Sequence, residues 1–175
     1  MKTLIFALAM VLTFSVVSAE NVTITTTTSA TADKVGDIDR PGLLLKFDLP
    51  GKLQGAWIDL AYLRFKVEPD SSQPAISLLV RPMIESWTSG SKLSALSDSA
   101  AASPFHVNFG RLNLKDGNGK IEITQAVKAW QSGELTNLGL LVYPDEEKEG
   151  AFQLKNLPDG GVAELEIFYT APGKN

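Results

Sequence analysis

The sequence predicts an all-β protein, an antiparallel β-sandwich or jelly roll with one short helix. Short segments in which apolar and polar residues alternate indicate strands with one buried face. Turn residues separate these segments at intervals of about ten residues, which is typical of sandwiches. Only one segment has the spacing of an amphipathic helix. Because the number of short strands is high for a chain of 175 residues, we expect a jelly roll.

Residues 1–19 are predicted to be a secretory signal peptide. Lys2 precedes an apolar run over residues 4–17, and small residues stand at Val17 and Ala19, before the expected cleavage site at Glu20. The run is shorter than the roughly 20 residues of a membrane helix, which disfavours the alternative of a retained anchor. We therefore expect a secreted, periplasmic or cell-surface protein with no membrane span after cleavage. Cleavage removes one lysine and no acidic residue, so the formal charge changes from −4 to −5.

Residues 20–42 form a Thr/Ser-rich N-terminal segment before the main domain, which is expected over residues 43–175. The stretch 21–32 predicts either a flexible lead-in or a first edge strand, because threonine favours strands. Residues 33–42 contain three aspartates and a proline, which indicates a loop.

The alternating pattern is clearest in two segments after this loop. In residues 43–49 the odd positions are all apolar, and Lys46 and Asp48 alternate with them, which predicts a strand with one solvated face. Residues 58–67 show a similar pattern, but Ile58 is out of phase with Ala61. This mismatch predicts a β-bulge between the two residues.

The remaining strands are expected where short apolar segments lie between turn signals. The sequence Asp116-Gly117-Asn118-Gly119 predicts the turn of a β-hairpin, because Gly and Asn tolerate positive φ angles. The expected strands cover residues 75–80, 107–114, 119–123, 138–143, 151–154 and 163–169.

Residues 125–131 are the predicted helix. Thr124 is the expected N-cap and Gly133 the expected C-terminal end. Val127 and Trp130 are three residues apart, so both should lie on the inner face of this helix.

Several of these segments carry sequence motifs. They are LLLKFDLP at 43–50, IDLAYLRF at 58–65, residues 80–87, IEITQAVKAWQSG at 121–133, NLGL at 137–140, Phe152 and LEIFY at 165–169. Together these motifs resemble those of the DNRLRE-domain family. The string formed by Thr124, Trp130, Gly133 and Gly139 is the most specific part of the resemblance, and the six-letter DNRLRE string itself is absent.

The resemblance implies a β-sandwich module of secreted bacterial proteins. Part of that family is classed as carbohydrate-binding module family 96, which is associated with alginate-degrading enzymes, while other members are surface proteins. It therefore implies a non-catalytic module that binds a polysaccharide or cell-surface glycan, in particular an acidic one such as alginate. The alternative is a structural or adhesive protein of the envelope or extracellular matrix that acts through contacts with a protein partner.

Five residues are the candidate ligand-binding side chains. Trp57 stands at the entrance to a strand with its phase pointing outward, and Tyr62, Arg64 and Lys66 occupy the solvated face of that strand. Lys46 has a similar position on the preceding strand. Sugar C–H faces stack on aromatic planes, and uronate carboxylates accept bidentate hydrogen bonds from arginine. The alternative is an ordinary solvated strand face with extended charged side chains.

The other two tryptophans, Trp87 and Trp130, are expected in the core, because buried aromatic residues dominate the packing of a small sandwich.

Composition excludes several classes of function. Cysteine is absent, so neither disulfides nor thiolate metal sites can form. His106 is the single histidine, and a Ser-His-Asp triad would have to use it. Glu164 and Glu166 are more typical of the solvated face of an edge strand than of a glycosidase pair. We therefore expect no enzyme activity, and the net negative charge disfavours nucleic acid as a partner.

Asp33, Asp37 and Asp39 are the candidate metal ligands. Loop carboxylates are hard oxygen ligands that suit a structural calcium ion, although their spacing differs from that of an EF-hand loop. No other cofactor is expected.

Overall fold

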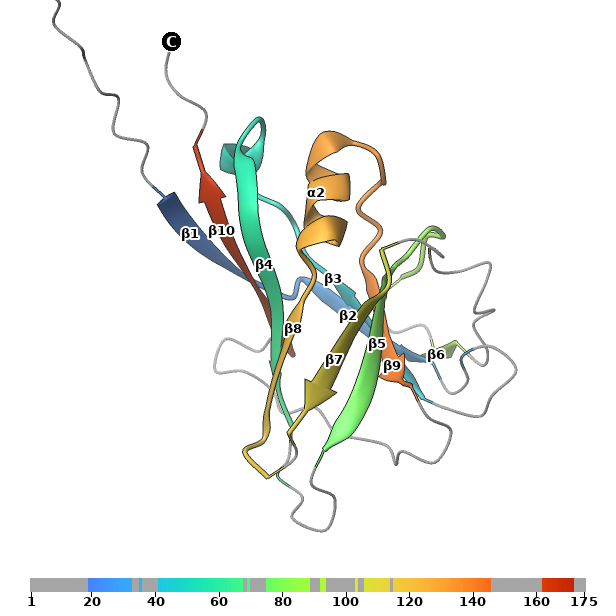
Figure 1. Cartoon of the computed structure of the whole chain (residues 1–175). Coiled ribbons are helices and arrows are strands. Elements are labelled where there is room, and N and C mark those ends of the chain that lie inside the picture. Colours follow the sequence, from blue (N-terminus) through green and yellow to red (C-terminus); the bar gives the residue numbers. More distant parts are fainter. Residues whose placement is uncertain are drawn as a thin grey trace, which may run out of the picture.

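A computed structural model of the chain consists of two β-sheets packed face to face (Figure 1). It describes residues 19–32, 35, 41–67, 69, 75–88, 92–93, 103, 106–113, 115–145 and 162–171. The four-stranded sheet has the order β1 (Ala19–Thr25), β10 (Ala163–Thr170), β4 (Trp57–Lys66) and β8 (Asn118–Glu122). The six-stranded sheet has the order β6 (Lys92–Leu93), β2 (Thr28–Ala32), β3 (Gly42–Lys46), β9 (Leu140–Pro144), β5 (Ile76–Pro82) and β7 (Asn108–Leu112).

The chain crosses repeatedly from one sheet to the other, as in a jelly roll. Strands β3, β5, β7 and β9 lie side by side in one sheet, whereas β4, β8 and β10 lie in the other. All strand pairs are antiparallel except the short pair of β2 with β6. Among the described residues the α-helix α2 (Thr124–Ser132) and the 3-10 turn η1 (Gly51–Leu53) are the helical elements. The predicted all-β sandwich with one short helix is confirmed.

The inter-sheet core is built from the alternating residues of the strands. On β10 every second side chain is buried, and the acidic residues between them are only half-buried on the outer face. The same alternation on β4 buries Ala61, Leu63 and Phe65. The period-2 pattern of the sequence is therefore the pattern of burial.

The predicted β-bulge lies in β4. Phe168 pairs with Leu60, but the next residue, Tyr169, pairs with Ile58, so Asp59 is the extra residue. The bulge allows Ile58 to point into the core together with Ala61.

The first part of the N-terminal segment, up to Ala32, belongs to the sandwich. Residues 19–32 form β1, at the edge of the four-stranded sheet, and β2, in the six-stranded sheet. At the corner between them the Thr26 amide donates to the carbonyl of Ala163 at 2.9 Å. The next amide, that of Thr27, donates to the carbonyl of Lys46 at 2.9 Å, and the two acceptors belong to different sheets. The edge-strand alternative is therefore the one that forms here, in place of a flexible lead-in.

The predicted hairpin at residues 107–123 is wrong in its pairing. The turn exists, with Gly117 at φ +61°, but β7 pairs with β5 and β8 pairs with β4. Among the described residues, the isolated bridge between Asn113 and Asn118 is the only backbone pairing between the two arms of this turn. The chain thus crosses between the sheets at this turn, because a period-2 pattern sets which face is buried and not which sheet the strand joins.

The helix ends as predicted and packs as predicted. Gly133 adopts the left-handed conformation at φ +79° and its amide donates to the carbonyl of Trp130. Val127 and Trp130 are both buried against the inter-sheet core.

The predicted N-cap role of Thr124 is wrong. Ile123 stands at the cap position without a side-chain hydrogen bond. The Thr124 hydroxyl instead accepts the Ala61 amide at 3.0 Å and donates to the Glu122 carboxylate at 3.0 Å. The Ile123 amide still donates to the Ala61 carbonyl at 2.9 Å, but the Ile123 carbonyl accepts the Val127 amide of the helix. The Ala61 amide therefore needs another acceptor, and the Thr124 hydroxyl provides it.

The prediction that Trp87 lies in the core is only partly correct. Trp87 is half-buried and packs against a second apolar cluster, to which Leu44 and Leu141 belong, on the outer side of the six-stranded sheet. Its indole nitrogen donates to the carbonyl of Leu138 at 2.7 Å. The difference arises because β5 ends at Pro82, so Trp87 no longer follows the alternation of that strand.

The predicted strand at 151–154 lies outside the described residues. No helix within the described ranges has the length and apolar character needed to cross a membrane.

Candidate functional site

Four of the five predicted ligand-binding residues lie on one strand. Trp57, Tyr62, Arg64 and Lys66 all belong to β4, and the Trp57 side chain is 69% exposed. Lys46 lies on β3, in the six-stranded sheet, so the structure does not bring it to the other four. The reason is that the chain changes sheets between β3 and β4. Lys46 has a position in the alternation of β3 like that of Lys66 in β4, but the two strands belong to different sheets.

The middle of the β4 face is occupied by contacts between its own side chains. A guanidinium nitrogen of Arg64 lies 3.3 Å from a carboxylate oxygen of Glu166 on β10. The Lys120 ammonium lies 3.8 Å from the centroid of the Tyr62 ring, and Phe168 makes an edge-on contact with the same ring at 6.4 Å between centroids. A ligand could stack on this face of Tyr62 only after Lys120 moved away.

The charges on this sheet face are mixed. Glu164, Arg64 and Lys120 stand opposite one another on β10, β4 and β8. In the next row Glu166, Tyr62 and Glu122 stand opposite one another on the same three strands. Cations and carboxylates are therefore neighbours on this face. The prediction that Glu164 and Glu166 lie on an edge strand is wrong, because β10 lies between β1 and β4.

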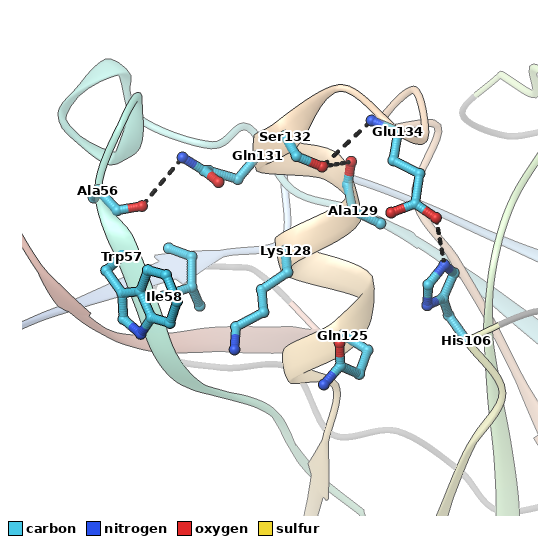
Figure 2. Close-up of a pocket in the computed structure, with 10 residues that line it drawn as sticks. All are labelled: Ala56, Trp57, Ile58, His106, Gln125, Lys128, Ala129, Gln131, Ser132 and Glu134. Atoms are coloured by element: carbon cyan, nitrogen blue, oxygen red, sulfur yellow. Dashed lines mark hydrogen bonds and ion pairs between the residues drawn. The ribbon is translucent and has the colours of Figure 1, made fainter.

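The most open aromatic residue of the candidate site borders a pocket. Trp57 lies at the start of β4, beside a pocket of about 240 Å³ that extends over α2 (Figure 2). One wall consists of Ala56, Trp57 and Ile58, and the opposite wall of His106 and Glu134. The pocket residues from α2 lie between these walls in the figure.

Hydrogen bonds to the helix hold the Trp57 wall. The turn η1 precedes this wall and Leu53 in it is buried. The side-chain amide of Gln131 donates to the carbonyls of Leu53, at 3.3 Å, and Ala56, at 3.2 Å. These bonds tie the residues before Trp57 to α2, so the indole starts from a fixed backbone.

The helical part of the pocket is a single stripe of α2. Gln125, Lys128, Ala129 and Ser132 lie on one helix face. Lys128 and Ala129 follow Gln125 by three and four residues, and Ser132 follows these two by four and three. The Lys128 ammonium lies 5.6 Å from the centroid of the Trp57 ring, within reach of a cation–π interaction. One end of the pocket therefore combines an aromatic plane with a positive charge.

The opposite wall carries a histidine and a carboxylate. His106 Nε2 lies 3.4 Å from Glu134 Oε1, on the other side of α2 from Trp57 (Figure 2). Among the described residues His106 is the only one other than glycine with a positive φ, +59°. The Asn108 side-chain amide donates to the His106 carbonyl at 2.7 Å and holds this conformation.

Sequence reasoning missed most of this pocket. It considered His106 only as the histidine that a catalytic triad would have to use, and it did not select Lys128 or Glu134. The helical spacing of Gln125, Lys128 and Ser132 was a signal that could have placed them on one face. Nothing in the sequence indicated that His106 would face Glu134, because the fold brings together residues 28 positions apart.

The predicted calcium ligands Asp33, Asp37 and Asp39 lie outside the described residues. Within the described part of the chain, no group of three or more His, Cys, Asp or Glu side chains could hold a metal ion. The calcium site stays a prediction.

Comparison of the sequence with protein-family models finds no matching family, and comparison with curated proteins finds no match either. The resemblance to the DNRLRE-domain family thus rests on its motifs. The fold explains two of the most specific residues of those motifs, because Trp130 is buried and Gly133 ends the helix. Gly139 has φ +101°, and a Cβ there would clash with the carbonyl of Leu45.

Proposed function

We propose that the protein is an exported, non-catalytic module of the DNRLRE type that binds an acidic glycan in the pocket beside Trp57. The observation that carries the proposal is the exposed indole of Trp57 with the Lys128 ammonium 5.6 Å from its ring, at the rim of a pocket.

The chemistry of this arrangement suits an acidic sugar. An exposed indole offers a flat apolar surface on which the C–H face of a sugar ring can stack. The ammonium of Lys128 is a charge partner for a uronate carboxylate within reach of the same ring. Gln125 and Ser132 add an amide and a hydroxyl that can exchange hydrogen bonds with sugar hydroxyls.

The size of the pocket limits what enters it. A volume of about 240 Å³ is below the roughly 300–1,000 Å³ of sites for drug-sized ligands. The pocket would therefore hold a short part of a glycan chain. The rest of the chain would lie on the surface, and we expect Tyr62 and Arg64 to contribute little, because each already contacts a neighbouring side chain.

Affinity electrophoresis of Trp57→Ala tests the proposal. Gels that contain alginate, a neutral glucan or no polymer report binding as retarded migration. We expect alginate to retard the wild type, and Trp57→Ala to weaken this binding at least about tenfold, as for an aromatic hot spot. Thermal stability should be unchanged, since the side chain is mostly exposed.

Phe109→Ala is the matched control. Phe109 is also 69% exposed, but it lies on β7 in the other sheet. Its loss should leave glycan binding intact. Equal migration of the wild type and Trp57→Ala in alginate gels, or equal weakening by both variants, would contradict the proposed site.

Phe109 also favours a second candidate function, a structural or adhesive role through protein contacts. Phe109 and Arg111 are both exposed and, two residues apart on β7, they share one side of the strand. Aromatic and arginine side chains are enriched at protein interfaces. This role predicts that Phe109→Ala, and not Trp57→Ala, lowers retention of the protein on isolated cell-envelope fractions.

A further inference from the structure

We infer that the pocket selects a glycan in which an acidic sugar is joined to a neutral one, in preference to a chain of uronates only. The inference rests on the proposed function and specifies its ligand class. It follows from the opposite charges that the two walls of the pocket present.

The Trp57 end favours a carboxylate. Lys128 is the charged side chain that lines the pocket at this end. The nearest acidic residue along β4, Asp59, is not part of the pocket lining, and its carboxylate accepts a hydrogen bond from Thr170 at 3.1 Å. A uronate stacked on Trp57 would therefore meet a cation.

The far end presents a carboxylate of its own. The Glu134 side chain is 64% exposed and lines the pocket. His106 is its partner at 3.4 Å, and an imidazole offsets a carboxylate charge only when it is protonated. A second uronate at this end would face a like charge, whereas the hydroxyls of a neutral sugar can donate hydrogen bonds to Glu134.

The backbone fixes this separation of charge. Gly133 turns the chain in the left-handed conformation directly before Glu134, whose amide donates to the Ser132 hydroxyl at 3.4 Å. On the facing segment, Asn108 holds the left-handed conformation of His106. Both side chains of the far wall thus start from backbone positions that the fold determines.

Calorimetric titration with three tetrasaccharides tests the inference. Alginate tetrasaccharide contains only uronates, hyaluronate tetrasaccharide alternates glucuronate with N-acetylglucosamine, and cellotetraose is neutral. We expect the wild type to bind the hyaluronate fragment most tightly. Glu134→Gln should raise the affinity for the alginate fragment about two- to fivefold, the range for an interaction between exposed charges, and should not raise that for the hyaluronate fragment.

Glu164→Gln is the matched control, because it removes the same charge from β10, opposite Arg64 and outside the pocket lining. It should leave the ratio of the two affinities unchanged. If the wild type binds both acidic fragments equally, or if Glu134→Gln raises both affinities alike, the inference is wrong. If Trp57→Ala still weakens binding at least about tenfold in that case, the proposed function stands without this inference. Absence of binding to all three sugars would overturn both.

Discussion

Two tryptophans of this chain allow one substitution to be compared in opposite environments. Trp130 is 7% exposed on the inner face of α2, whereas Trp57 is 69% exposed at the pocket rim. Trp130→Ala should strongly lower the free energy of unfolding, and Trp57→Ala should hardly change it.

The expected magnitude follows from the buried area. An aromatic side chain of this kind buries about 150–250 Å², which at about 25 cal/mol per Å² corresponds to roughly 4–6 kcal/mol as an upper estimate. Measured large-to-small substitutions of buried aromatics cost about 3–5 kcal/mol, and we expect Trp130→Ala in that range. Among the described residues the Trp130 indole nitrogen has no hydrogen-bond partner, so the expected loss is counted from packing alone. For Trp57→Ala we expect less than about 0.5 kcal/mol.

Urea unfolding followed by far-UV circular dichroism measures both values. The midpoint should fall for Trp130→Ala while the slope of the transition stays constant. Trp130→Phe, which keeps most of the apolar volume and loses no hydrogen bond, should cost clearly less and serves if the alanine variant does not fold. A loss below about 1 kcal/mol for Trp130→Ala would refute the assignment of this residue to the core.

Three further predictions concern residues that do not line the pocket. Gly139→Ala should lower stability by about 1–3 kcal/mol in a calorimetric scan, because alanine is strained at φ +101°, and an unchanged melting temperature would contradict this. A double-mutant cycle of Arg64→Ala and Glu166→Ala should give a coupling of at most about 1 kcal/mol that falls with added salt, since Arg64 is 49% exposed. The Tyr169 hydroxyl donates to the Glu20 carboxylate at 2.6 Å, which raises the pKa of Tyr169 above 10.0. The wild type should therefore exceed Tyr169→Phe in melting temperature below pH 10, and this difference should narrow, not widen, as the pH rises through the raised pKa.

Local patterns predicted much of the fold. The alternation along β4 and β10 correctly gave their buried faces, and the phase error at Ile58 correctly gave the bulge. Gly133 was correctly predicted to end the helix. Each of these features depends on one strand or one turn, where sequence spacing and backbone geometry are directly linked.

Predictions that required knowing which other strand or helix an element contacts were less accurate. The turn before Gly119 was recognised, but the strands on either side of it belong to different sheets. Thr124 was assigned to a helix cap, and its hydroxyl binds the Ala61 amide of a neighbouring strand instead. In both cases a distant strand competed with the local interaction.

In the candidate site, too, the property of a single strand was predicted and the contacts between elements were not. The exposure of Trp57 was predicted from its phase along β4, and the structure agrees. The expected companion Lys46 lies in the other sheet, while Lys128 and Glu134 were not foreseen as neighbours of the site. The surroundings of Trp57 depend on the packing of α2 against β4. This packing cannot be predicted from the sequence of either element alone.

Sequence patterns were sufficient to predict the strand-rich class, the buried and solvated faces of β4 and β10, and the end of the helix. These properties arise from side-chain period and backbone torsion preference, which act over a few residues. The tertiary structure alone decided which strands became neighbours, and therefore that a cation borders one wall of the pocket and a carboxylate the other. Such contacts join residues that are distant in the chain, and their geometry exists only once both sheets and the helix have packed together.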